Sequence, residues 1–278
     1  MKNIPDYVGW QGITARYVHF LFCGCILMFL VLPVLAVIPL SLNAEPYFNY
    51  PIQHFCLRWY EDMMTSPYWL LALKNTMTVG ILATLIATVL GVLAALGLSH
   101  PNLPGKGWIT ALLLSPMIVP LVIAAVGMYF FYTKVGLAGN LTGLVLAHAA
   151  LGTPFVVITV TATLVGYNDN LTRAARSLGA NPFYAFWKIK LPMIAPGVVS
   201  GALFAFATSF DEVIVALFLS GVEQRTVPRQ MWSGVREQLS PTILAVATVL
   251  VIFSILLLTT MELLRRRTER LRGIPRGD

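Results

Sequence analysis

The chain has 278 residues, of which 57% are hydrophobic and only 11% are charged. Soluble domains carry about a quarter charged residues, so this composition excludes an ordinary soluble domain and indicates a membrane protein whose surface largely faces lipid. The formal net charge of +7 does not indicate nucleic-acid binding, because the basic residues gather at the ends of apolar stretches and in the C-terminal tail. Membrane orientation accounts for that distribution.

Six apolar segments are long enough to cross a bilayer as helices. Trimmed of their polar ends, they are 17–42, 70–98, 108–131, 142–165, 194–220 and 241–263. The segments are long and do not alternate polar with apolar residues, so helices are expected instead of strands. The expected fold class is therefore an all-α integral membrane protein with six transmembrane helices.

The first segment follows Lys2 and Arg16 and begins like a signal peptide. Its apolar run continues to about Leu42, which is too long for a signal peptide, so we expect an uncleaved first span. Cys23 and Cys25 point about 200° apart on a helix and therefore cannot share a metal ion.

The basic residues predict the orientation of the chain. With the N-terminus inside, inner segments hold 13 Lys and Arg residues and outer segments hold 6. Both termini are therefore expected in the cytosol, and the basic tail is expected near anionic lipid. The tail arginines are Arg265, Arg266, Arg267, Arg270, Arg272 and Arg276.

His148 lies within the fourth segment. A lone membrane histidine most often forms a hydrogen bond between helices, which is the role we expect. A proton relay or a ligand contact is the alternative, although no second His or Cys at metal-binding spacing accompanies it.

The inner connection 166–193 is predicted to form two short helices beneath the membrane bundle. The first is expected over about 171–178, ending at Gly179, which suits a helix C-terminus. The second is expected to begin at Asn181-Pro182, an N-cap followed by proline, and to end before Pro192. On these features alone, an ordinary pair of interfacial helices is an equally good interpretation.

The same connection resembles the EAA motif of permease subunits in ABC importers. The matching residues, at the spacing of that motif, are Ala174, Ala175, Gly179, Ile189, Leu191 and Pro192. The resemblance implies that the loop is the coupling helix, which docks on a separate ATPase and transmits ATP-driven closure. Arg173 stands where the motif has Glu. It reverses the charge of that contact, and either meets an acidic rim on the ATPase or reinforces orientation.

The resemblance extends over about 69–264 and is strongest to the spermidine/putrescine permease branch. It rests on His148-Ala149 through Pro154–Val157, on Ser209–Val215, on Ser220-Gly221 and on Ser240-Pro241. It implies a type I ABC importer permease fold in the bacterial inner membrane. The implied partners are two ATPase copies, a second permease and an extracytoplasmic substrate-binding protein. The expected organisation is a first span with its outer loop (1–68), the permease core (69–264) and a basic tail (265–278).

The chain lacks the phosphate-binding motif that ATP hydrolysis requires. Its one Gly-Lys pair, Gly105-Lys106, has neither the preceding glycine nor the following Ser or Thr. We expect no cofactor in this chain, with ATP and Mg on the partner ATPase. No constellation typical of a membrane enzyme is present either, so a non-catalytic subunit is expected.

Apart from Glu262 at the very end of the last span, Asp211 and Glu212 are the only acidic residues within a predicted span. Carboxylates in a membrane usually face a bundle interior or a transport pathway. With Thr208 and Phe204 on the same side of a continuous helix, they suit an organic dication, through charge pairing and cation–π attraction.

Alternative interpretations remain open for these acids and for the chain. Asp211 or Glu212 is instead a salt-bridge partner of the second permease, or the substrate is another small solute such as an opine or an aminophosphonate. An anion carrier is disfavoured because the predicted spans contain no Arg or Lys other than Lys74, near the start of the second span. A secondary transporter driven by protons through Asp211 or His148 is the alternative from another class.

Overall fold

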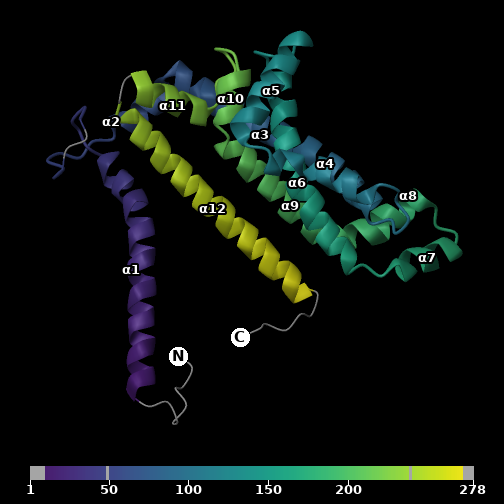
Figure 1. The fold of residues 1–278 in the computed structure, drawn as a ribbon. Helices are drawn as coiled ribbons and strands as arrows, with labels where there is room; N and C mark the ends of the chain where they lie inside the picture. The colour runs from purple at the N-terminus through teal and green to yellow at the C-terminus, as the bar shows by residue number, and fades with distance from the viewer. Residues whose placement is uncertain (1–9, 48–49, 238–239, 272–278) are drawn as a thin grey trace. The chain divides into compact units, whose positions relative to one another are not determined.

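The computed structural model describes residues 10–47, 50–237 and 240–271 (Figure 1). Within those ranges the regular secondary structure is helical apart from one isolated bridge between Asn43 and Phe55, and turns and irregular segments connect the helices. Among the described residues, five helices are long and apolar enough to cross a membrane, or six if the bent pair α4 and α5 forms one span. The elements are α1 Trp10–Leu40, α2 Arg58–Thr65, α3 Pro67–Leu98, α4 Lys106–Ile118, α5 Leu121–Lys134, α6 Leu141–Val165, α7 Asp169–Ser177, α8 Pro182–Ala185, the π-helical turn η1 Phe186–Lys190, α9 Leu191–Asp211, α10 Ile214–Leu219, α11 Val227–Glu237 and α12 Thr242–Leu271.

The chain divides into two compact units. The smaller one comprises residues 1–64 and 239–251. In it, α2 is tied to the end of α1, because the Trp59 indole donates a hydrogen bond to the Asn43 carbonyl (2.6 Å) and Tyr60 shares one with Ser41 (2.7 Å). The short helix α2 was not predicted; its only hint in the sequence is the spacing of Trp59 and Met63, which are both buried.

The larger unit comprises residues 65–238 and 252–278 and is built on three helices, α3, α6 and α9, that run side by side (Figure 1). Small residues let these helices approach closely. A Cβ at Gly152 of α6 would lie 2.9 Å from Ala205 of α9, and a Cβ at Gly201 would lie 2.8 Å from the Val156 Cα. The three helices therefore pack as one close bundle, since each of them contacts the other two.

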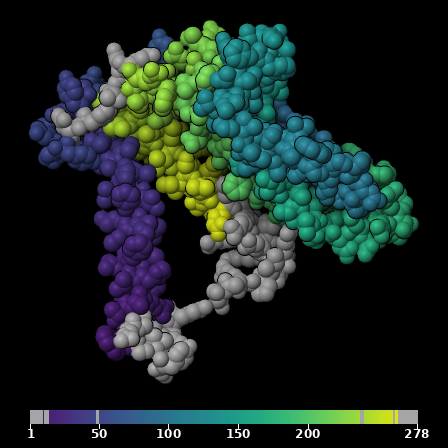
Figure 2. All heavy atoms as spheres, in the orientation of Figure 1, coloured from purple at the N-terminus to yellow at the C-terminus, as the bar shows by residue number. Residues whose placement is uncertain are grey.

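The predicted span 108–131 is wrong as a single helix. It breaks at Val119-Pro120 into α4 and α5, whose axes differ by 103°. Pro120 donates no backbone hydrogen bond, and its ring disfavours a helical conformation at Val119, which is extended (φ −68°, ψ 132°), and α4 ends there. α4 lies beside α6 (Figures 1 and 2).

The last predicted span begins as expected, since α12 starts at Thr242. The helix continues to Leu271, so the first part of the expected tail is helical, while 272–278 lie outside the described residues. The outer connection before it holds a second unpredicted helix, α11.

Candidate functional site

We call residues 166–193 the knob. Its first helix is α7. Asn168 caps this helix by accepting a hydrogen bond from the Asn170 N–H (3.0 Å). At the other end, the Ala180 N–H bonds to the Ala175 carbonyl and the Gly179 N–H bonds to the Arg176 carbonyl, both at 3.0 Å. This pair of bonds is a Schellman C-cap, and it places Gly179 at φ +92°, where glycine is favoured. The predicted helix end at Gly179 is confirmed.

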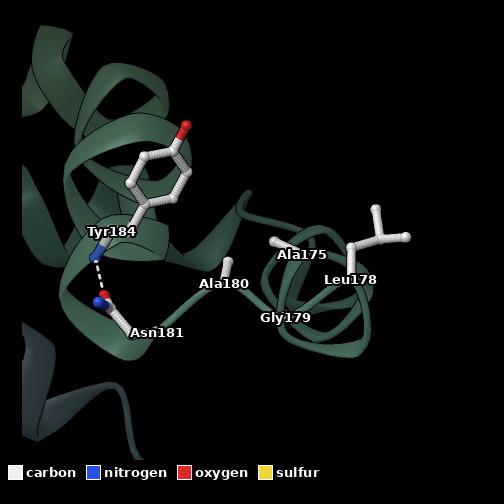
Figure 3. A pocket seen from close by; sticks show the side chains of 6 residues that line it. All are labelled: Ala175, Leu178, Gly179, Ala180, Asn181 and Tyr184. Carbon is white, nitrogen blue, oxygen red and sulfur yellow. Dashed lines mark hydrogen bonds between the residues drawn. The ribbon is translucent and has the colours of Figure 1, made fainter.

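The second helix of the knob begins where the sequence predicts. The Asn181 side chain accepts a hydrogen bond from the Tyr184 N–H (2.7 Å), and Pro182 occupies the first turn (Figure 3). Its predicted end before Pro192 is wrong. A π-helical turn follows, in which the Leu191 N–H bonds to the Phe186 carbonyl, and the helix continues into α9. Pro192 is the second residue of α9, directly after this π-helical turn, and it donates no backbone hydrogen bond.

Several large apolar side chains are exposed on the surface of the knob. Leu178 is 89% exposed, and the Phe183 and Trp187 rings, 6.0 Å apart, are also exposed. A pocket of about 490 Å³ lies between α7 and α8, and Figure 3 shows Tyr184 and Leu178 on opposite sides of the Gly179-Ala180 turn. Its lining residues are Ala175, Leu178, Gly179, Ala180, Asn181 and Tyr184.

The motif residues divide between the tip and the base of the knob. Arg173, Ala174 and Gly179 are exposed, and Ala175 is half-buried beside the pocket. At the base, Ile189 is half-buried, and Leu191 packs against the core cluster of α3, α6 and α9. Pro192 is exposed at the start of α9.

The fifth predicted span is also interrupted, which changes the surroundings of its two acids. The helix does not pass through Glu212 as expected; α9 ends at Asp211, Glu212 is extended (φ −75°, ψ 115°) and α10 follows. The Glu212 side chain is 7% exposed, and its Oε1 accepts a hydrogen bond from the Val215 N–H (2.9 Å). Its carboxylate therefore caps the start of α10.

Asp211 differs from its neighbour because its side chain is exposed. On α9 before it, Thr208 is half-buried and Phe204 is 44% exposed, with its ring stacked on Phe155 at 6.3 Å. This exposed side of the helix does not continue beyond the break, since Val215 is fully buried in α10. The residues brought together on the surface of α9 are thus Phe204, Thr208 and Asp211, without Glu212.

His148 anchors α9 one turn before the break. Its Nδ1 lies 2.8 Å from the Ser209 hydroxyl oxygen, and both side chains are buried. This bond between α6 and α9 confirms the predicted interhelical role.

A family model described as "Binding-protein-dependent transport system inner membrane component" matches residues 87–270. The match includes α6, the whole knob and the break after α9. The chain belongs to this family. It is thus a permease, a non-catalytic membrane component of a transport system.

The permease is similar to the spermidine/putrescine transport system permease protein PotC of Haemophilus influenzae, with 30% identity over 241 residues that cover 87% of this chain and 93% of PotC. It is 29% identical over 230 residues to the putrescine transport system permease protein PotI of Escherichia coli K12, covering 80% and 81%. A chain from a bacterial ABC transporter that imports the polysaccharide alginate superposes with a TM-score of 0.71 and 16% identity, covering 95% of this chain and 99% of that one. This last likeness shows that the permease has an ABC transporter permease fold.

Sequence reasoning missed three residues at the base of the permease's knob. Lys190 pairs with Asp169 and lies over the ring of Tyr167. The sequence offers two lysines in this turn, Lys188 and Lys190, and their spacing alone does not tell which one faces α7.

Proposed function

We propose that the permease is the transmembrane subunit of an ATP-driven importer, and that it moves a small organic cation such as spermidine or putrescine across the bacterial inner membrane. The observation that carries the proposal is the similarity to PotC along 87% of the chain. PotI, a putrescine transport system permease protein, points to the same class of substrate. Opines and aminophosphonates are the competing substrates.

The assembly that we propose contains two ATPase subunits, a second permease and an extracytoplasmic binding protein. ATP and Mg belong to the ATPase subunits in this scheme. The exposed tip of the knob supports docking on the ATPase, because Leu178, Phe183 and Trp187 offer apolar surface at the cytoplasmic end of the expected orientation. Closure of the ATPase then moves the knob, and the membrane helices switch between inward- and outward-open states.

The substrate pathway in this proposal runs along Asp211, Thr208 and Phe204. These residues are spaced by three and four positions on α9, so they lie on one side of the helix. An exposed carboxylate near an exposed aromatic ring suits an organic cation. Glu212 takes a structural role, since its carboxylate is occupied with the start of α10.

The test is uptake of radiolabelled spermidine and putrescine by the complete importer in proteoliposomes with ATP inside. Because contacts to charged groups are worth about 1.5–3 kcal/mol, Asp211→Asn is expected to lower uptake by about tenfold or more. Asp62→Asn is the matched control, since Asp62 is an exposed carboxylate in α2, far along the chain from the break. Unchanged uptake and unchanged substrate-stimulated ATP hydrolysis in Asp211→Asn would remove Asp211 from the pathway.

Two further arms separate the alternatives. Unlabelled opine or aminophosphonate can be added as a competitor of labelled spermidine uptake. If either inhibits uptake more strongly than putrescine does, the substrate belongs to that class and is not a polyamine. Uptake by the permease alone, abolished by an uncoupler but not by ATP depletion, would establish a proton-coupled secondary transporter.

A further inference from the structure

At the base of the knob, Lys190 contacts Tyr167, in the short connection between α6 and α7, and Asp169, the first residue of α7. The Lys190 Nζ lies 3.3 Å from the Asp169 Oδ1 and 4.9 Å from the centre of the Tyr167 ring. The Tyr167 hydroxyl is itself hydrogen-bonded to the Thr172 hydroxyl at 2.6 Å. One ammonium group thus contacts residues immediately before and after the Asn168 cap of α7.

The surroundings of Lys190 distinguish this contact from an ordinary surface ion pair. Exposed pairs of lysine and carboxylate contribute little, because water screens the charges and both side chains lose freedom. The Lys190 side chain is only 20% exposed, although that of Asp169 is 69% exposed. The aromatic ring adds cation–π attraction where the ammonium is partly desolvated, so the lysine is held from two directions.

The position of Lys190 in the chain gives the contact its significance. It is the last residue of η1 and directly precedes α9, whereas Asp169 is the first residue of α7. Along the chain, α7 reaches α9 only through the turn at Gly179-Ala180, then α8 and η1. The contact bypasses that route and joins the first turn of α7 directly to the base of α9.

A displacement delivered to the base of α9 would be carried to the break at Asp211. The helical segment from Pro182 to Asp211 is continuous over 30 residues. Beyond the base, Ile194 is fully buried among residues of α3, α6 and α9, and Gly201 leaves no room between α9 and Val156 of α6. This packing makes α9 move as a body together with its neighbours.

We infer that Lys190, Asp169 and Tyr167 form a clamp that transmits motion of α7 to α9, with Lys190 as its positioning residue. The inference rests on the proposed function, since it supposes that an ATPase moves the knob. A permease without the clamp retains its knob and its pathway. Motion of α7 is then absorbed in the turn at Gly179-Ala180, and ATP is hydrolysed with less transport.

The test measures ATP hydrolysis and labelled spermidine uptake in the same proteoliposomes containing the complete importer. Lys190→Met keeps the length of the side chain and removes its charge. We expect the ratio of uptake to ATP hydrolysed to fall by about fivefold, the scale of one ion pair plus one cation–π contact. Lys190→Arg should restore most of the ratio. Lys188→Met is the matched control, since Lys188 belongs to the same turn and is exposed, and it should leave the ratio unchanged.

The outcomes separate this inference from the proposed function. Absence of ATP-dependent uptake by the wild-type complex would refute the proposed function itself. Normal uptake by the wild type, together with an unchanged ratio in Lys190→Met, would overturn the clamp alone, as would an equal loss in Lys188→Met. If Lys190→Met fails to co-purify with the ATPase, Asp169→Asn provides the same test from the other side, and an unchanged ratio in that variant overturns the clamp.

Discussion

Replacing Glu212 with alanine should destabilise the break between α9 and α10, whereas replacing it with glutamine should be tolerated. The Glu212 Oε1 accepts the hydrogen bond of the Val215 N–H at 2.9 Å, and the Val215 side chain is fully buried. Alanine removes the acceptor and leaves that N–H without its partner. Glutamine keeps an acceptor oxygen in nearly the same place and removes only the charge.

The expected loss in the free energy of unfolding follows from the type of hydrogen bond and from its position in the membrane. Losing an N-cap costs about 1 kcal/mol, a hydrogen bond to a charged group is worth about 1.5–3 kcal/mol, and side-chain bonds within membranes average about 0.6 kcal/mol. α10 has only 6 residues, too few to hold a helical conformation without such support. We therefore expect a loss of about 2 kcal/mol in the free energy of unfolding for Glu212→Ala and about 0.5 kcal/mol for Glu212→Gln.

The assay is unfolding of the purified importer in detergent, alongside spermidine uptake in proteoliposomes. Asp211→Asn is the matched control, because Asp211 is the adjacent carboxylate and is exposed. It should lower uptake without lowering stability, whereas Glu212→Gln should lower neither appreciably. A Glu212→Gln variant that is as stable as the wild type but has lost uptake would show that Glu212 acts on the substrate through its charge, and our structural reading of it would be refuted.

Two further substitutions test local features of the fold. Gly179→Ala should weaken the knob by about 1 kcal/mol, because Gly179 has φ +92°; amide hydrogen exchange across 177–181 should accelerate, and Gly97→Ala in α3, which meets no neighbouring atom, should have no such effect. Asn75→Ala removes two hydrogen bonds, to the carbonyls of Glu223 (2.7 Å) and Arg225 (3.0 Å), at a cost of about 1–3 kcal/mol. Trypsin should then cleave after Arg225 faster than in the wild type or in the exposed control Asn102→Ala, and equal rates would contradict this anchoring role.

The membrane helices were largely predictable because lipid imposes a simple requirement on the sequence. A segment must be apolar for about 20 residues to cross, and the predicted segments 70–98 and 142–165 differ from α3 and α6 by at most three residues at either end. The same requirement says nothing about local polar contacts. This is why α2 and α11, which are too short and polar to cross, were not expected.

The two breaks were missed for a different reason. A proline or an acid within an apolar run is compatible with a kink, a break or an undisturbed helix, and the neighbours decide among them. Val119 before Pro120 is extended, and Glu212, which is outside the helix, accepts a hydrogen bond from the Val215 N–H. Hydropathy averages over both effects, so it predicted one helix in each case.

In the knob, too, the local features could be predicted from the sequence and the contacts between elements could not. Its caps follow from Gly179 and Asn181-Pro182, whose conformational preferences are strong and local. The role of Lys190 depends instead on the π-helical turn, which sets the direction of each side chain in it. Lys188 and Lys190 are equally plausible from their sequence positions, and only the fold brings Lys190 to Asp169.

The π-helical turn at Phe186–Lys190 also limits how the knob can be exchanged between proteins. Such a turn accommodates one residue more than an α-helical turn, so every side chain after it is rotated by about 100° relative to those before it. Deleting one residue there would restore a regular helix but turn the buried face of α9, with Ile194, away from α6. A chimaera that takes its knob from another permease should therefore be joined after Leu191, so that the irregular turn travels with the knob and the register of α9 is preserved.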